Sequence, residues 1–246
     1  MGVVLLITII LGNIGSGKTA CVVRDMVLDK TRRLTYSNII TSKVPTNKCI
    51  SPNMVFEQYE NEKGKLDLRL NKDYWHALQK KHGSISVVID EAHTIMNARN
   101  TQSKKNKIMS DFLSMLRRVL GGASKGYGEL VLITQLERRI DIIAREMANL
   151  IIFHRCHFYK NCKKCKLKWY ENNDMSEQLF ICPRCDSSNI YSSSHTIERW
   201  YFRNFEHFAL WRDMKEKTYF KHYFVNDIVK YFDYYDTMQW DNLLTD

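Results

Sequence analysis

The sequence predicts an α/β protein in which helices cover a parallel sheet, with a small metal-binding module attached. Short apolar runs alternate with helical patterns through the first 155 residues, which is typical of a parallel sheet. The first run leads directly into the glycine-rich stretch GNIGSGKT, and two Cys-x-x-Cys pairs follow the last run.

The length and the net charge agree with a globular protein that binds a phosphate-rich partner. The 246 residues suffice for one large domain or for a domain with a small module. A net charge of +10 favours nucleic acid or an anionic membrane face as partner. The opening apolar run, residues 3–11, is shorter than the roughly 20 residues of a membrane helix, and it lacks a basic region and a cleavage site. We therefore expect neither a transmembrane segment nor a signal peptide.

The first half of the chain begins with a buried strand. Residues 3–11 are largely β-branched and are expected to form a central parallel strand. A helix over 19–30 and a second strand over 34–40 should follow. Residues 42–70 show no clear period and are expected to be irregular, whereas 72–82 have the pattern of a polar helix.

Further strands and helices alternate up to residue 154. A short buried strand is predicted at 86–90 and a Lys-rich loop at 97–107. The later elements are a helix at 108–120, a strand at 129–134, a helix at 140–147 and a strand at 150–154. We divide the chain into a core of residues 1–158, a cysteine module of residues 159–191 and an aromatic-rich segment of residues 192–246 that packs on the core.

The stretch GNIGSGKT fits the phosphate-loop pattern G-x-x-x-x-G-K-[ST], with an apolar strand before it and a helix after it. Backbone N–H groups of such a loop surround phosphate oxygens, and the helix N-terminus adds a favourable dipole. We expect Lys18 to reach the β- and γ-phosphates and Thr19 to offer its hydroxyl to Mg²⁺. The predicted nucleotide-binding residues of this P-loop NTPase fold are Gly12, Asn13, Ile14, Gly15, Ser16, Gly17, Lys18 and Thr19.

Two polar positions after later strands complete the expected site. Asp90 ends the strand SVVID and would hold the magnesium, and Glu91 would polarise the attacking water. Gln135 follows the strand ELVLIT and would contact the γ-phosphate. The chain lacks the Asn-Lys-x-Asp motif of GTPases in a suitable place, which argues against a GTPase. The Leu-Ser-Gly-Gly-Gln signature is incomplete, which argues against a transporter ATPase. We expect the nucleotide to be ATP.

These motifs, together with FLSMLRRVLGGASKGYGELVLITQLERRIDIIAREMANLIIFH, resemble the FtsK–HerA group of DNA-pumping ATPases, which have RecA-like cores. The chain is most similar to zonula occludens toxin-like ATPases of filamentous phages and to viral genome-packaging ATPases, over about residues 1–158. The resemblance implies a ring, usually a hexamer, in which an arginine from one subunit reaches the γ-phosphate in the next. By motif position this residue would be Arg118, with Arg117 and Arg145 as alternatives.

Cys162, Cys165, Cys182 and Cys185 have the spacing of a four-cysteine structural zinc site, and their surroundings suit a zinc ribbon. Disulfides are the weaker alternative, because cytosolic conditions disfavour them. The other cysteines, Cys21, Cys49 and Cys156, are expected to be small buried residues. The module either staples the fold or contacts nucleic acid.

A cationic patch on this module would contact the phosphate backbone without reading bases. The candidate nucleic-acid contacts are Lys163, Lys164, Lys166, Lys168 and Arg184, with Lys104 and Lys105 of the Lys-rich loop as a second set.

The sequence thus predicts a DNA-translocating ATPase that packages a viral genome and uses ATP, Mg²⁺ and Zn²⁺. Its expected partners are double-stranded DNA, copies of itself in a ring, and a capsid or membrane component. We expect it in the cytoplasm, that of the host cell for a viral protein, or with the virion. The alternatives are an ATPase for virion assembly or extrusion, and a nucleotide-switched zinc-ribbon protein that binds nucleic acid.

Overall fold

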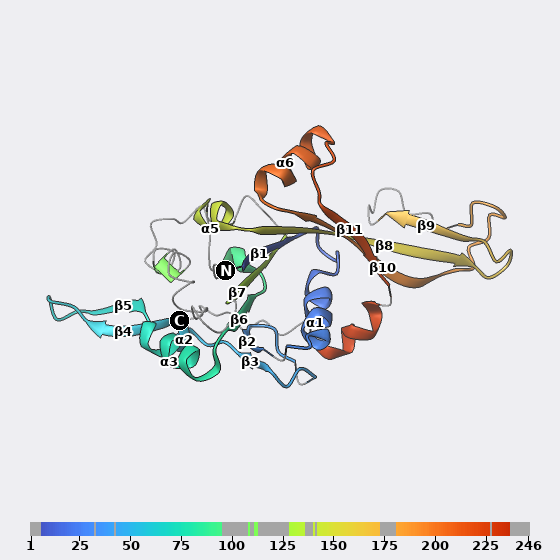
Figure 1. The fold of residues 1–246 in the computed structure, drawn as a ribbon. Coiled ribbons are helices and arrows are strands. Elements are labelled where there is room, and N and C mark those ends of the chain that lie inside the picture. Colours follow the sequence, from blue (N-terminus) through green and yellow to red (C-terminus); the bar gives the residue numbers. More distant parts are fainter. Residues whose placement is uncertain are drawn as a thin grey trace.

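The computed structural model describes residues 6–31, 33–41, 43–94, 108, 111–112, 128–135, 140, 142–172, 181–226 and 228–236. Nine strands of these ranges form one sheet with the order β11-β10-β8-β1-β7-β6-β2-β3, and β9 pairs with β8 (Figure 1). The strands from β8 to β3 run parallel, whereas β10, β11 and β9 are antiparallel additions at the β8 side. This confirms the predicted parallel sheet with helices.

Apolar side chains on both faces explain why the central strands form a buried parallel sheet. In β1, every residue from Ile7 to Leu11 is buried, and β6 is buried throughout. Leu11 at the end of β1 lies opposite Thr134 of β7 and Phe153 of β8. The parallel strands are β1 (Leu6–Leu11), β2 (Leu34–Ser37), β3 (Asn47–Cys49), β6 (Ile85–Ile89), β7 (Glu129–Thr134) and β8 (Leu150–Cys162).

Helices cover both faces of the sheet. On one face, α1 (Lys18–Leu28) packs Val22 and Val23 against Ile10 and Ile152. The other face carries α3 (Lys72–His82), α5 (Ile142–Met147) and α6 (Phe205–Met214), which share one apolar core. Figure 1 shows α1 and α6 on opposite sides of β8 and β10. No helix in the described ranges is both long and apolar enough to span a membrane.

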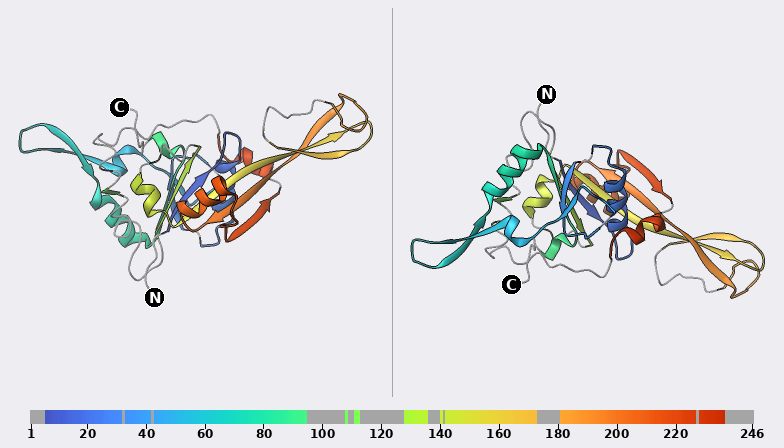
Figure 2. Two further views of the ribbon diagram at one scale, coloured as in Figure 1. Left: turned by 90° about the horizontal axis from the view of Figure 1, so that it is seen from above. Right: turned by 90° about the horizontal axis from the view of Figure 1, so that it is seen from below.

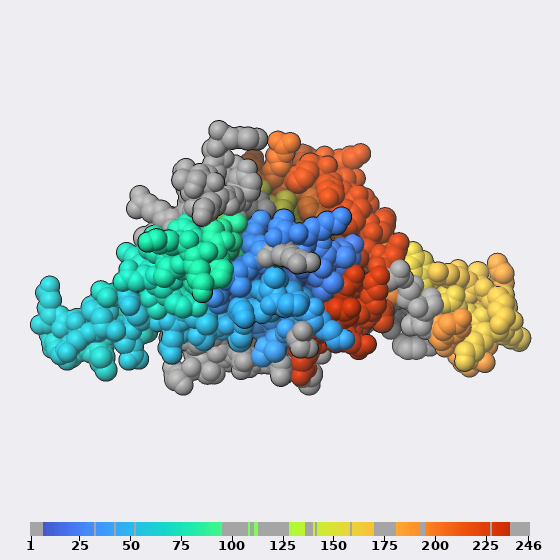
Figure 3. All heavy atoms as spheres, turned by 60° about the horizontal axis from the view of Figure 1, so that its bottom comes forward, coloured from blue at the N-terminus to red at the C-terminus, as the bar shows by residue number. Residues whose placement is uncertain are grey.

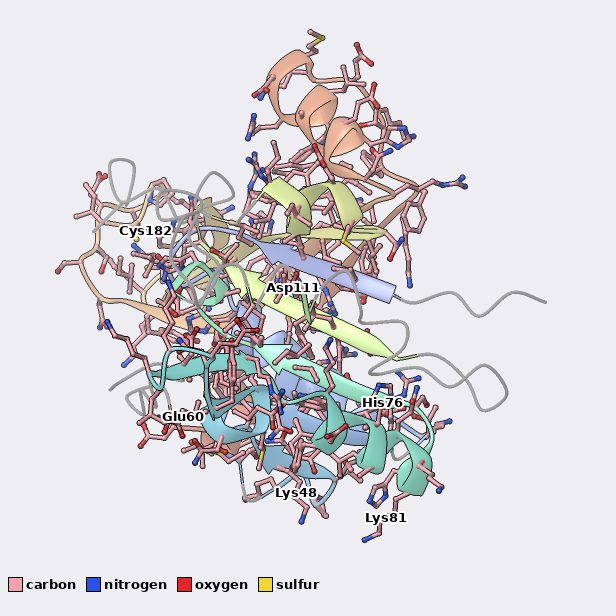
Figure 4. All side chains as sticks on the ribbon, turned by 90° about the vertical axis from the view of Figure 1, so that its left-hand side faces the viewer. Lys48, Glu60, His76, Lys81, Asp111 and Cys182 are labelled. Carbon is pink, nitrogen blue, oxygen red and sulfur yellow. The ribbon has the colours of Figure 1, made fainter. Side chains whose placement is uncertain are left out.

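Several predicted elements are confirmed closely. Helix α3 has the predicted bounds and ends at Gly83, and its buried residue is Trp75. Figure 4 shows His76 and Lys81 on this helix, at the end of the sheet away from α6. Strand β7 also has the predicted bounds, whereas β2 ends at Ser37, short of residue 40. The side chain of Ser37 bonds the backbone of Ile39, which turns the chain away from the sheet.

The prediction that residues 42–70 are irregular is wrong. Besides β3 and the short helix α2 (Pro52–Val55), they form a hairpin of β4 (Phe56–Glu60) and β5 (Leu66–Leu70). Its turn is stabilised by the side chain of Asn61 and by Gly64, whose φ is 68°. The hairpin projects from one end of the molecule (Figure 2), and its apolar alternation is confined to Leu66, Leu68 and Leu70 of β5.

A second projection lies at the opposite end and contains the four cysteines of the two Cys-x-x-Cys pairs (Figures 2 and 3). It is built by β8 and β10 (Ile190–Phe202), which pair antiparallel along their length, and by β9 (Lys168–Asn172). The predicted strand 150–154 is therefore only the first part of β8.

The described part of the C-terminal segment contacts β10 and α1. Strand β11 (Lys221–Val225) pairs with β10, and the 3-10 segment η5 (Ile228–Tyr234) lies against α1. Trp200, Phe208 and Trp211 form an aromatic cluster with Phe153 of β8. The division of the chain at residues 158 and 191 stays a prediction.

Candidate functional site

The glycine-rich loop leaves β1 and enters α1 at the carboxyl edge of the sheet. Gly12 and Gly17 have φ values of 154° and 75°, which disfavour other residues. A Cβ on Gly12 would lie 2.6 Å from the backbone oxygen of His154 in β8, so the loop begins against the neighbouring strand. The sequence therefore places glycine where the backbone must turn and pass close to β8.

Lys18 lies at the centre of this loop and is only 7% exposed. Its Nζ donates to the backbone oxygens of Gly12 at 2.8 Å and Asn13 at 2.9 Å. Burial lowers the pKa of Lys18, while Asp90 and Glu91 oppose that shift. The ammonium group is thus fixed inside the loop, where it can donate to a phosphate oxygen.

Asp90 and Thr19 form the candidate magnesium pair. The hydroxyl of Thr19 donates to Oδ2 of Asp90 at 2.6 Å. Burial raises the pKa of Asp90, and the hydrogen bonds from Thr19 and from the N–H of Glu91 oppose that rise. A carboxylate and a hydroxyl oxygen are donors that Mg²⁺ accepts, so the residues present fit the predicted ion.

Asn38, at the end of β2, holds the backbone of Asp90 from both sides. Its Oδ1 accepts from the N–H of Asp90 at 2.7 Å, and its Nδ2 donates to the carbonyl of Asp90 at 2.9 Å. The sequence prediction missed this residue. The strand predicted over 34–40 places Asn38 inside a strand, so its role follows only from where β2 ends and from the pairing of β2 with β6.

The side chains of Glu91 and Gln135 are hydrogen-bonded to each other. Nε2 of Gln135 donates to Oε1 of Glu91 at 2.7 Å, and Nδ1 of His93 lies 3.2 Å from Oε2. Glu91 has a φ of 50°, a left-handed conformation that a non-glycine residue adopts only when its surroundings hold it. The carboxylate is thereby oriented between two partners beside the phosphate loop.

A cavity of about 640 Å³ opens next to the loop on the face that carries α6. Gly12, Asn13 and Gln135 line one side of it. Its other walls come from β8 and α6 and are cationic or aromatic: Phe153, Arg155, Phe208, Trp211, Arg212 and Lys215. The sequence prediction did not include these residues, because they lie far apart in the chain.

Of the three arginines predicted to act on a neighbouring subunit, the structure describes only Arg145. Arg118 and its alternative Arg117 lie outside the described residues, as do Lys104 and Lys105. Arg145 lies in the last turn of α5 and does not line the cavity beside the loop.

The four predicted zinc ligands come together at the end of the long ribbon. Their Sγ atoms all lie within 4.8 Å of one another, with Cys162 and Cys185 3.6 Å apart and Cys165 and Cys182 3.4 Å apart. In a tetrahedral site with Zn–S bonds of about 2.3 Å, sulfur atoms lie about 3.8 Å apart. The cluster therefore fits a zinc ion closely.

The two Cys-x-x-Cys turns repeat the same backbone geometry. Lys166 and Asp186, directly after the second cysteine of each pair, have φ values of 60° and 52°, and each donates its N–H to the carbonyl of the first cysteine. The backbone N–H of Cys165 donates to Sγ of Cys162 and lowers its pKa to about 6. This hydrogen bond favours the thiolate of Cys162, and the thiolate is the form that binds a metal.

The predicted DNA contacts on this tip are exposed: Lys163, Lys164, Lys166, Lys168 and Arg184. Lys168 lies over the ring of Tyr159 and Lys163 over that of Tyr191, so part of the patch is held in place by aromatic rings. Of the remaining cysteines, Cys21 and Cys156 are buried as predicted, whereas Cys49 is exposed. The short strand β3 lies at the sheet edge, which leaves Cys49 uncovered.

Comparison with known structures supports the fold. The chain is similar to the N-terminal domain of zonular occludens toxin from Neisseria meningitidis, with 20% identity, a TM-score of 0.50, and coverage of 94% of this chain and 99% of that one. It is also similar to the genome-packaging NTPase B204 of Sulfolobus turreted icosahedral virus 2 in complex with AMPPCP, with 22% identity, a TM-score of 0.41, and coverage of 61% and 75%. No curated protein sequence matches.

The family assignment rests on the sequence itself. Residues 6–174, which run from β1 to the middle of the cysteine ribbon, match the family described as zonular occludens toxin (Zot). This confirms the resemblance drawn from the loop, the acidic strand and the strand that ends in Thr-Gln. The chain belongs to the zonular occludens toxin (Zot) family.

Proposed function

We propose that this protein hydrolyses ATP to move double-stranded DNA during packaging of a viral genome, and that it works as a ring, expected to be a hexamer. A capsid or membrane component would anchor the ring. One observation carries the proposal: Lys18, the adjacent pair Asp90 and Glu91, and Gln135 come from three separate segments and lie together at one edge of the sheet.

The residues can divide the work of hydrolysis as follows. Lys18 and the loop N–H groups bind the β- and γ-phosphates. Thr19 and Asp90 would hold Mg²⁺, which neutralises phosphate charge when bound. Glu91 accepts a proton from the attacking water, and Gln135 keeps the Glu91 carboxylate pointed at it. Arg118 of a neighbouring subunit would stabilise the transition state, with Arg117 or Arg145 in its place as alternatives.

The cysteine cluster and the basic tip would serve the nucleic acid. A zinc ion on Cys162, Cys165, Cys182 and Cys185 would fix the tip, because closed four-thiolate sites are structural and not catalytic. The exposed lysines would then track the phosphate backbone, and Lys104 and Lys105 would add a second contact.

The first test measures the ATPase rate of a sized oligomer with and without double-stranded DNA. We expect DNA to raise the ATPase rate of the wild type, and we expect the Lys18→Ala variant to show no DNA-stimulated ATPase activity. Lys30→Ala is the matched control, because Lys30 is an exposed lysine just beyond the same helix. Unchanged DNA-stimulated turnover in Lys18→Ala would contradict the proposal.

A second test separates binding from chemistry. Glu91→Gln removes the proton acceptor but keeps the hydrogen-bonding shape, so turnover should fall by about 10²–10⁴-fold while ATP binding stays within about threefold. Glu146→Gln, an exposed carboxylate on α5, is the control. Equal turnover in Glu91→Gln and wild type would show that another group activates the water.

Membership of the Zot family supports a second candidate, an ATPase that drives virion assembly or extrusion without gripping DNA. In that case the oligomer should hydrolyse ATP at a rate that neither double- nor single-stranded DNA changes. A nucleotide switch that binds nucleic acid would instead show nucleotide-dependent binding with almost no turnover.

A further inference from the structure

Arg155 is a cationic side chain beside the nucleotide loop that has no assigned role. It lies two residues after Phe153 on β8, and Phe153 is in register with Leu11 at the end of β1. Because side chains alternate along a strand, Arg155 and Phe153 share the face that carries α6, opposite to α1. The loop and Arg155 therefore line the same cavity from neighbouring strands.

The carboxylate opposite Arg155 on β10, that of Glu198, is bonded to His157 and His222 and not to Arg155. The guanidinium of Arg155 lies 5.1 Å from the centre of the Trp200 ring. Within the described part of the chain it has no carboxylate partner, whereas Arg212 in the same cavity pairs with Asp213 at 2.7 Å. The cavity also contains Lys215 and no acidic side chain among its lining residues. A preorganised cation of this kind is suited to bind an anion.

The position of Gln135 identifies which part of a nucleotide would meet Arg155. Gln135 is bonded to Glu91, the proposed proton acceptor, and it lines the cavity together with Gly12 and Asn13. The cavity thus opens on the side of the loop where the terminal phosphate reacts. We propose that Arg155 binds the terminal phosphoryl group in cis, stabilises the charge on its oxygens during transfer to water, and receives the orthophosphate product in the cavity.

This inference rests on the proposed ATP hydrolysis and adds a residue to it. The bond between the terminal phosphorus and the bridging oxygen breaks, water supplies the new oxygen, and Glu91 takes the proton. Arg155 donates hydrogen bonds to the phosphoryl oxygens and exchanges no proton. Its contribution should therefore be largest when the transferring group is planar and most dispersed in charge.

The test compares the affinity of the 246-residue protein for Mg·ADP with and without aluminium fluoride, a planar anionic mimic of the transferring group. Wild type should bind ADP more tightly with the fluoride. Arg155→Gln should lose most of that gain, keep its affinity for ADP alone within about threefold, and lower kcat by about 10²-fold. Arg155→Lys should restore part of the fluoride-dependent gain in affinity and part of kcat, because lysine keeps the positive charge.

Arg203→Gln is the matched control, because Arg203 is also exposed and lies over an aromatic ring, that of Phe220, outside the cavity. Arg155→Met retains packing on Trp200, so it separates the effect of charge from the effect of packing. A full fluoride-dependent gain in Arg155→Gln or Arg155→Met would overturn the inference. Absence of turnover in wild type would instead contradict the proposed ATPase function.

Discussion

His154, a residue behind the phosphate loop, makes the stability of the protein depend on pH. It is fully buried behind the loop, and neither ring nitrogen has a hydrogen-bond partner among the described residues. Burial lowers its pKa well below 6.5, and the charges of Arg199 and Lys18 add to that effect. The folded protein therefore keeps His154 neutral where the unfolded chain would bind a proton.

The sign of the resulting pH dependence follows from this difference. Below pH 6.5 the unfolded state binds more protons, so the free energy of unfolding falls as the pH falls. The His154 contribution should approach about 1.4 kcal/mol per pH unit. We expect His154→Leu to flatten the curve between pH 6.5 and 5, measured by urea unfolding. Parallel curves for wild type and the variant would contradict the assignment.

At the scale of elements, an ion pair with a buried guanidinium joins β10 to α1. Arg199 is 2% exposed and donates to Asp25 at 2.8 Å and to the hydroxyl of Tyr223 at 3.2 Å. Burial is the largest single influence and opposes the charge on Arg199, but the charge of Asp25 together with smaller contributions from Tyr201, Cys21 and Tyr223 raises its pKa. The pair fixes the helix that follows the phosphate loop to the added antiparallel strands.

Removing one partner should loosen this junction. Asp25→Asn leaves the buried guanidinium without its counter-ion, and we expect the free energy of unfolding to fall by about 1–3 kcal/mol. Asp29→Asn, one turn further on and exposed, should change it by less than about 0.5 kcal/mol. Chemical denaturation of the two variants checks this, and equal effects would assign the loss to surface charge.

The elements also show what the sequence could and could not predict. Buried strands such as β1 and β7, and the capped helix α3, carry strong local patterns and were predicted well. The β4–β5 hairpin and the outer part of β8 project from the core, so burial imposes little apolar period on them, and in these segments only Leu66, Leu68 and Leu70 of β5 alternate. The structure places the residues given by motifs near one another, but the positions of Asn38 and Arg155 depend on strand pairing, which no short motif encodes.

At the scale of the whole molecule, the basic tip stands away from the nucleotide site, so the two should be separable (Figure 2). Replacing Lys163, Lys164 and Lys166 with Gln should weaken DNA binding and reduce its salt dependence, by about 0.9 in slope for each phosphate that is no longer neutralised. Basal ATP hydrolysis should stay unchanged. A matched triple variant of Lys63, Lys65 and Lys72, at the hairpin end, is the control, and a fall in basal hydrolysis would indicate that the tip only staples the fold.

Metal removal tests the same separation. A strong zinc chelator should release one ion per chain and abolish DNA binding, because the tip loses its cross-link. Nucleotide binding should persist, because β8 is also held by its pairing with β1 and β10. Cys182→Ser should behave like the chelated protein and Cys49→Ser like wild type. Loss of nucleotide binding on chelation would contradict this picture.

The unbroken course of β8 has a mechanical consequence. The strand meets Gly12 at His154 and continues without interruption to Cys162, which is about 25 Å further along at about 3.3 Å per residue. One end of β8 is held in the sheet, and its cysteine end projects beyond the sheet with β10 paired along it. Any tilt at the end held in the sheet is magnified in proportion to that length, so a small adjustment around the terminal phosphate would sweep the basic tip through a larger arc.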